Sequence, residues 1–191
     1  MRVDHVILAA ADLDRAAERI EAEHGLRAVG GGRHEGLGTH NRIVPLGGGY
    51  LEILAVADAE EAADSPLGRA VSERIGSGDG LMGWAVAVDD VTPVAERLGT
   101  EVSTITRQGL SASLTGVTEA MAEPFLPFFI SRDHGIPDPG AGAEHGGIEW
   151  IEVSGDAARL ADWLGGAELP VRVVDGPPGV RAVGIGGESF G

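Results

Sequence analysis

The chain has 191 residues, 43% of them hydrophobic, which is typical of one sizeable domain or two small subdomains built around a real core. A net charge of -16 makes nucleic acid and anionic membranes poor partners, and the absence of cysteine excludes disulfides, thiolate catalysis and cysteine-bound metals. No apolar run approaches the roughly 20 residues of a membrane helix. The N-terminal stretch MRVDHVILAAADLD lacks the basic region of a signal peptide, so we expect a cytoplasmic protein.

The first predicted elements are a strand and a helix within DHVILAAADLDRAAERI, residues 4–20. The strand is a short apolar run, and the helix opens at an aspartate and continues with apolar residues at helical spacing. Two further strands are predicted at residues 42–46 and 50–56, joined by the glycine turn at 47–49. A short helix at residues 66–75 then leads into the connector SGDG. The pattern is a strand and a helix followed by a hairpin.

The same pattern returns twice along the chain. A second copy, MGWAVAVDDVTPVAERL at residues 82–98, keeps the aspartate before the helix and the closing Ala-Glu-Arg-apolar signature. A third and fainter copy is GIEWIEVSGDAARLADWL at residues 147–164. The strands predicted after these two copies lie at residues 111–116, 125–131, 170–175 and 180–185.

Connectors rich in glycine and proline separate the copies and divide the chain into units at residues 1–78, 79–137 and 138–191. One such unit has an apolar sheet face that it cannot cover alone, so two units should pair and curve around a shared cleft. Polar side chains that point into this cleft are expensive to keep without a ligand or a hydrogen-bond partner. The sequence therefore predicts a binding site on the inner face of a paired sheet.

Four stretches carry a resemblance to a known family: DHVILAAADLD, GLGTHNRIVPLGGGYLEIL, LPFFISRD and the partial unit after AEHGG. Their order resembles the vicinal oxygen chelate superfamily, which contains glyoxalase I, extradiol dioxygenases and bleomycin- or fosfomycin-resistance proteins. The glyoxalase-like branch is the most similar. The resemblance implies an α+β fold in which paired βαβββ modules form an open, cupped, mixed sheet. A partial third module is then expected to complete or extend that sheet.

The resemblance also implies a metal site, because metal-dependent members use a His on the first strand and a Glu on the fourth strand of each module. His5 and Glu52 match these positions in the first module. In the second module the matching positions fall on Gly83 and near Ile130 or Ser131, which are poor ligands for a divalent cation. His145, in the connector before the third unit, is a candidate for an additional ligand. The cofactor expected is a divalent metal such as zinc, nickel, manganese or iron, or none.

Other polar residues are candidates for the cleft. Tyr50 and Glu52 share one strand face, and a carboxylate desolvated on that face meets the conditions for a general base. His40 and Asn41 are adjacent, so only one of them can face the cleft unless the backbone turns there; Asn41 is expected to fix a ligand by hydrogen bonding and His40 to act as a spare ligand or acid/base group. His34 is a weaker candidate in a glycine-rich loop that serves either as a lid or as a connector.

The second unit contributes further expected site residues. Arg132 follows its last strand, where a bidentate guanidinium would suit a substrate carboxylate. Trp84 and either Phe128 or Phe129 are expected to line the pocket, and the remaining large aromatic residues to pack the core.

The chain is expected to be a monomer or a homodimer, and three functions stay open on these grounds. The first is a lyase, isomerase or dioxygenase in which a metal held by His5 and Glu52 polarises an oxygen of a small oxygenated metabolite. The second is a metal-free protein that sequesters a small hydrophobic or aromatic molecule, as resistance proteins do. The third and weakest is a structural or regulatory dimer whose own side chains fill the cleft.

Overall fold

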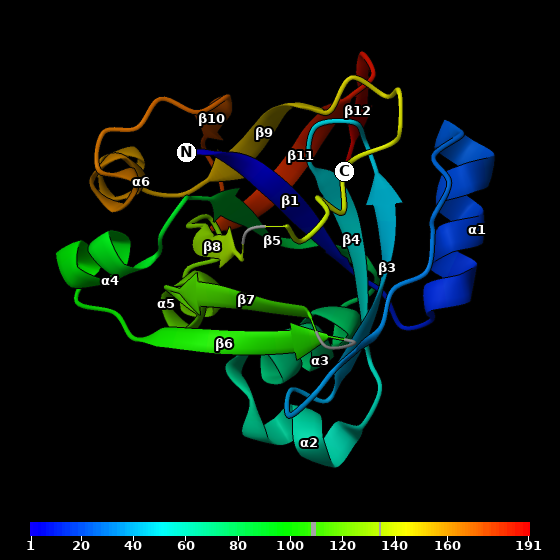
Figure 1. The fold of residues 1–191 in the computed structure, drawn as a ribbon. Coiled ribbons are helices and arrows are strands. Elements are labelled where there is room, and N and C mark those ends of the chain that lie inside the picture. The colour runs from blue at the N-terminus through cyan, green and yellow to red at the C-terminus, as the bar shows by residue number, and fades with distance from the viewer. Residues whose placement is uncertain (108–109, 134) are drawn as a thin grey trace.

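The structure, a computed structural model, describes residues 1–107, 110–133 and 135–191. These residues form an eight-stranded sheet in the order β2-β3-β4-β1-β5-β8-β7-β6 and a four-stranded sheet in the order β10-β9-β11-β12 (Figure 1). None of the helices in this part of the chain is long and apolar enough to cross a membrane.

The first module ends in two helices that follow its last strand. Its elements are β1 (Arg2–Ala9), α1 (Leu13–His24), β2 (Arg33–His34), β3 (Thr39–Pro45), β4 (Tyr50–Val56), α2 (Ala59–Asp64) and α3 (Pro66–Gly76). Helix α1 begins where the Asp12 carboxylate accepts the backbone N–H groups of Asp14 and Arg15, and it ends at Gly25 in the left-handed region. The short strand β2 has no clear sequence signal, because two residues are too few to show alternation.

The second module repeats this plan. Its elements are β5 (Gly80–Ala87), α4 (Thr92–Leu98), β6 (Val102–Arg107), β7 (Leu110–Thr115), α5 (Val117–Ala122) and β8 (Phe128–Arg132). Strand β4 runs parallel to β1, β8 runs parallel to β5, and the two modules join where β1 and β5 pair antiparallel. This arrangement confirms the cupped sheet of paired βαβββ modules that the sequence predicted.

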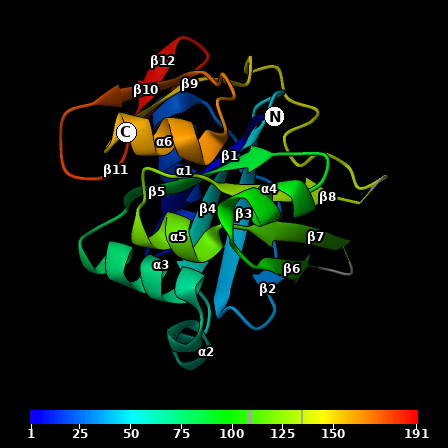
Figure 2. The same ribbon diagram turned by 90° about the vertical axis from the view of Figure 1, so that its left-hand side faces the viewer.

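The third unit forms a sheet of its own and, among the described residues, adds no strand to the eight-stranded sheet. Its elements are β9 (Ile148–Ser154), α6 (Ala157–Leu164), β10 (Val171–Val174), β11 (Gly179–Ile185) and β12 (Glu188–Phe190). Ile151 and Val183 belong to the same core cluster as Val6 and Trp84, so this sheet packs against the outer face of the paired modules. Figure 2 shows it at the opposite end of the molecule from α2 and α3.

Alternation along β1 separates the two faces of the large sheet. Val6 and Leu8 point into the outer core with α1 and the third unit. Ile7 and Ala9 belong to a second cluster on the inner face, where α3 contributes Val71. Both faces of β1 are covered, which explains why the second half of the strand is entirely apolar and its polar residues lie near its start. Those polar residues, Asp4 and His5, are buried on the inner side of the cup.

Candidate functional site

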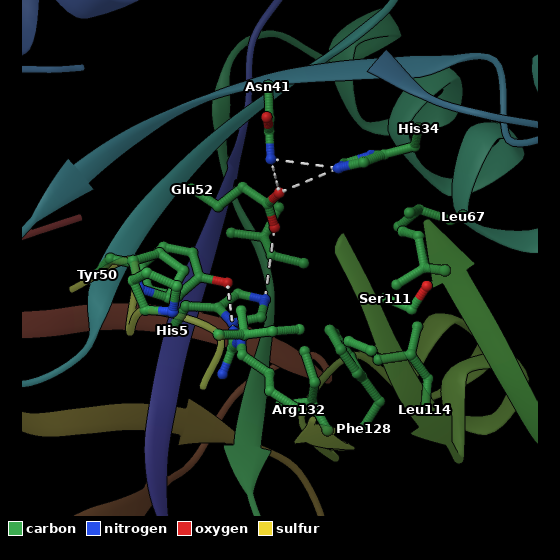
Figure 3. A pocket seen from close by; sticks show the side chains of 17 residues that line it. His5, His34, Asn41, Tyr50, Glu52, Leu67, Ser111, Leu114, Phe128 and Arg132 are labelled. Atoms are coloured by element: carbon green, nitrogen blue, oxygen red, sulfur yellow. Dashed lines mark hydrogen bonds and ion pairs between the residues drawn. The ribbon is translucent and has the colours of Figure 1, made fainter. Parts of the chain in front are cut away.

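A pocket lies on the inner face of the cup and includes about 780 Å³ of empty space, counting open solvent at its mouth. Strands β1 to β4 supply most of its polar side chains, whereas β6 to β8 supply an apolar wall (Figure 3). We call Ile105, Leu114, Phe128 and Ile130 the apolar wall. The other lining residues are His5, Ile7, His34, Asn41, Tyr50, Glu52, Leu67, Ser111, Ala112, Arg132, Ile136, Pro137 and Pro139.

The imidazole of His5 lies at the base of this pocket. It stacks on the Tyr50 ring with centroids 4.6 Å apart, and the edge-on ring of Phe128 lies 5.5 Å away. Its Nδ1 is 2.7 Å from a carboxylate oxygen of Asp4, so the neutral ring carries its proton on Nδ1 and a lone pair on Nε2. Nε2 is 3.4 Å from Glu52 Oε2, close enough for an ion pair, but among the described residues it has no hydrogen-bond partner.

Adjacent strand residues normally point to opposite faces, yet Asp4 and His5 both reach the inner side. The pairing of β1 with β5 explains this, because its register shifts between Val3 and His5 and leaves Asp4 in an irregularity. A bulge of this kind re-aims a side chain, and here it places a carboxylate directly behind the imidazole.

Asp4 is fully buried and is held by Arg132 of β8. Both terminal nitrogens of the guanidinium donate to the carboxylate at 2.7 Å, and one of them also lies 3.1 Å from the Tyr50 hydroxyl. Burial alone would raise the pKa of Asp4, but Arg132 and His5 outweigh it and hold that pKa well below the usual range. Burial likewise acts to lower the pKa of Arg132, yet Asp4 keeps it above its ordinary value. The ion pair therefore stays charged and joins the two modules behind His5.

Asp4 is a site residue that the sequence prediction missed, and its signal was a charged residue inside an apolar strand next to the matching histidine. The expected role of Arg132 also changes. Both of its terminal nitrogens are already bound to Asp4, so the bidentate contact expected for a substrate carboxylate is taken by the protein itself.

Glu52 lies on β4 between two polar neighbours. The strand register places Tyr50 beside His5 and Glu52 beside Ile7, which puts both side chains on the inner face. Glu52 Oε1 accepts a hydrogen bond from Asn41 Nδ2, and Oε2 faces His5. The Asn41 amide is oriented by its own oxygen, which accepts the backbone N–H of Gly32 at 2.9 Å. Tyr50, Glu52 and Asn41 are therefore brought together in the pocket.

The pocket contains His34 and not His40. Strand β2 folds against β3 and pairs His34 with Thr39, whose hydroxyl lies 2.9 Å from His34 Nδ1. His34 Nε2 is 3.2 Å from Asn41 Nδ2 and 3.7 Å from Glu52 Oε1. His40 points to the other side of β3 and lines a separate surface groove. The acid/base role expected for His40 in this pocket is therefore wrong, because the alternation of β3 gives the inner face to its neighbour Asn41.

The aromatic residues divide in a similar way. Trp84 is fully buried on the outer face of β5, and its indole N–H donates to the Phe125 carbonyl at 3.1 Å. Phe129 is also in the outer core, with its ring centroid 6.3 Å from that of Trp163. The expectation that Trp84 and Phe129 line the pocket is wrong. Phe128, one residue earlier on β8, faces the pocket instead.

The second module offers no metal ligand at the matching positions. The aspartates before the two helices, Asp12 and Asp90, align the modules. Seven residues before them lie His5 and Gly83, and five residues before them lie Ile7 and Ala85. Ile7 lies beside Glu52, whereas Ala85 lies beside Phe128. The register thus puts Phe128 at the position that matches Glu52, rather than Ile130 or Ser131. An aromatic ring in this place cannot bind a divalent cation as a carboxylate does.

His145 does not complete a metal site either. Its loop is pinned to the outside of the β3–β4 turn, where the Gly47 N–H donates to the Gly140 carbonyl, and His145 lines a different surface pocket with His24 and Glu188. Among the described residues no group of three or more His, Asp or Glu side chains is arranged to hold a metal ion. Only His5 and Glu52 remain of the expected set, and catalytic metal sites normally use three protein ligands, so these residues do not fit a resident divalent metal.

The fold is that of a glyoxalase-like protein. Residues 3–168 match the protein-family model described as a glyoxalase-like domain, and the chain belongs to that family. No curated protein sequence was found to match it. A crystal structure of a hypothetical protein from Staphylococcus aureus is similar with a TM-score of 0.71 and 16% identity, over 94% of this chain and 87% of that one. A share this large includes most of the third unit.

Methylmalonyl-CoA epimerases are also similar in structure. A variant from Streptomyces coelicolor, in complex with 2-nitronate-propionyl-CoA, has a TM-score of 0.55 and 20% identity over 69% of this chain and 97% of its own. The enzyme from Mycobacterium tuberculosis has a TM-score of 0.51 and 17% identity over 69% and 86%. At such identities the likeness is one of fold.

Proposed function

We propose that the pocket binds a small oxygenated metabolite and that Glu52 and His5 transfer a proton on it without a resident metal. One observation carries the proposal. The buried Nε2 of His5 has no hydrogen-bond partner among the described residues and faces the Glu52 carboxylate at the polar end of the pocket, opposite the apolar wall. A buried acceptor of this kind costs free energy unless a ligand uses it.

The surrounding residues suit proton transfer. Glu52 Oε2 can accept a proton from a carbon or hydroxyl of the ligand, while Asn41 holds the other carboxylate oxygen in place. His5 Nε2 can take up or return a proton at a second ligand atom. The imidazolium that then forms is stabilised by the Asp4 carboxylate behind it. Arg132 keeps Asp4 ionised, so Asp4 orients His5 and does not itself take the proton.

The cost of the site favours catalysis over simple sequestration. Burying the Asp4–Arg132 pair and the Glu52 carboxylate requires removing charges from water, which is rarely a net gain in stability. A pocket that only sequesters an apolar molecule needs none of these groups. Proton transfer in a lyase or isomerase reaction does need them, whereas dioxygenase chemistry relies on a metal centre that two protein ligands support poorly.

Binding without turnover is the second candidate, and Phe128 favours it. In the second module the apolar ring of Phe128 occupies the position that matches Glu52 in the first. This side of the pocket is therefore suited to holding an apolar molecule. On this account a ligand is recovered unchanged after long incubation.

Solvent exchange separates the two candidates. In D2O, a panel of 2-hydroxy ketones, 2-hydroxy aldehydes and acyl thioesters is incubated with the protein, and NMR follows deuterium entering the carbon next to the carbonyl. The panel includes methylmalonyl-CoA, because an epimerase of similar fold is known in complex with it. We expect exchange with the wild-type chain, a loss of at least about 100-fold in Glu52→Gln, and no change in the exposed control Glu96→Gln.

Three results would count against the proposal. Exchange that survives Glu52→Gln shows that another group takes the proton. Exchange that disappears with a chelator and returns with zinc, nickel or manganese supports the metal-dependent function. A compound that binds in the pocket with no exchange at any position favours the second candidate.

A further inference from the structure

The polar end of the pocket presents two hydrogen-bond acceptors side by side. In the neutral form of His5 the Nδ1–H donates to Asp4, which leaves a lone pair on Nε2, and Glu52 Oε2 is a carboxylate oxygen 3.4 Å away. We call these two atoms the acceptor pair. Two acceptors cannot satisfy each other, and Nε2 has no other partner among the described residues. A ligand that fits here must therefore bring a hydrogen-bond donor.

The positive charge at the pocket is already used. Of the described lining residues, Arg132 is the one with a permanent positive charge, and both of its terminal nitrogens donate to Asp4. One of them also contacts the Tyr50 hydroxyl. A carboxylate or phosphate entering the pocket would meet the Glu52 carboxylate with no permanent cation left to compensate it while His5 is neutral, which penalises anionic ligands.

The remainder of the ligand must be apolar. The apolar wall faces the acceptor pair across the pocket, and Leu67 of α3 adds to it. The Ser111 hydroxyl is the one polar group that β7 contributes to the described lining. An ionised amine would also donate hydrogen bonds, but it loses far more hydration than a hydroxyl when it enters such surroundings.

We infer that the ligand is an uncharged molecule whose hydroxyl group donates to the acceptor pair and whose apolar body packs against the apolar wall. This inference rests on the proposed function, because it uses the same two side chains, and it adds the class of compound that they recognise. The expected polar group of the ligand thereby changes from the carboxylate that Arg132 suggested in the sequence to a hydroxyl.

Matched probes test this inference on the intact chain. Four compounds share one body and differ in the polar group: 4-isopropylbenzyl alcohol, its methyl ether, 4-isopropylbenzylamine and 4-isopropylbenzoate. Binding is followed from the amide resonances of the ¹⁵N-labelled protein near neutral pH, so that the affected residues are seen directly. We expect the alcohol to shift His5, Glu52 and Phe128, and the ether and the benzoate to bind about 10-fold to 100-fold more weakly, because they cannot donate to a charged acceptor.

Variants tie the effect to the acceptor pair. Glu52→Gln should remove most of the preference of alcohol over ether, whereas the exposed Glu96→Gln should keep it. The inference is overturned if the benzoate or the amine binds at least as well as the alcohol, if alcohol and ether bind equally, or if the alcohol shifts no pocket resonance up to about 10 mM. If the alcohol binds selectively but no compound exchanges hydrogen with solvent, the ligand class stands and the proposed catalytic function is rejected. If a substrate that carries no hydroxyl exchanges, the catalytic function stands and the ligand class is rejected.

Discussion

Replacing Arg132 by Met should destabilise the protein strongly, because it leaves the Asp4 carboxylate buried without its cation. Asp4 is 0% exposed and the Arg132 side chain 15% exposed, so solvent screens this pair little. Removing one partner of a buried ion pair costs about 3–5 kcal/mol, and partial exposure of the arginine lowers our expectation to about 2–4 kcal/mol. That is a large share of the roughly 5–15 kcal/mol by which a domain is stable.

A surface ion pair supplies the control. Arg19 lies 3.4 Å from Asp79, with side chains 46% and 27% exposed, so Arg19→Met should cost no more than about 1 kcal/mol. Both free energies of unfolding are measured by urea denaturation near pH 7. The double variant Asp4→Asn with Arg132→Met should recover at least about 1 kcal/mol relative to Arg132→Met, because the buried charge at position 4 is removed together with its cation.

The pH dependence gives a second check with a definite sign. The folded-state pKa of Asp4 lies below its value in the unfolded chain, so its contribution is fully present above about pH 4 and is lost as the pH falls further. In Arg132→Met burial acts on Asp4 with less opposition, and the loss of stability on acidification should become smaller or reverse. A cost for Arg132→Met equal to that of Arg19→Met, or an unchanged acid slope, would refute the reasoning.

Three further outcomes are expected. Gly49→Ala should lower the free energy of unfolding by about 2–3 kcal/mol, because at φ +85° the added Cβ would lie 2.7 Å from a backbone oxygen of β1. Gly36→Ala, at φ +74° but with open space around the added Cβ, should lower it by about 1 kcal/mol. Equal losses in urea unfolding would contradict this reasoning. Trp84→Phe should lower stability by about 1–3 kcal/mol and leave the alcohol probe's affinity within about twofold, since the ring lies outside the pocket. His34→Ala should weaken that probe severalfold and His40→Ala should not; the opposite ranking in the NMR titration would disprove the assignment of His34 to the pocket.

The sequence by itself determined the repeat and its consequences. Aspartates before the helices, the glycine turn and alternation around Glu52 are local signals, so they could be read from a few neighbouring residues. They predicted the paired modules and the place of Tyr50 and Glu52 on the inner face. The poor match at Gly83 was equally visible, because it needed only a count along the chain.

Only the tertiary structure decided how the site is assembled. The pair of Asp4 and Arg132 joins residues 128 positions apart, and no local pattern carries information on such a contact. The bulge that turns Asp4 inward, the hairpin that brings in His34 in place of His40, and the register that sets Phe128 in place of a ligand all depend on how neighbouring strands align. Alternation fixes which residues share a face, but the pairing of strands decides which face looks into the pocket.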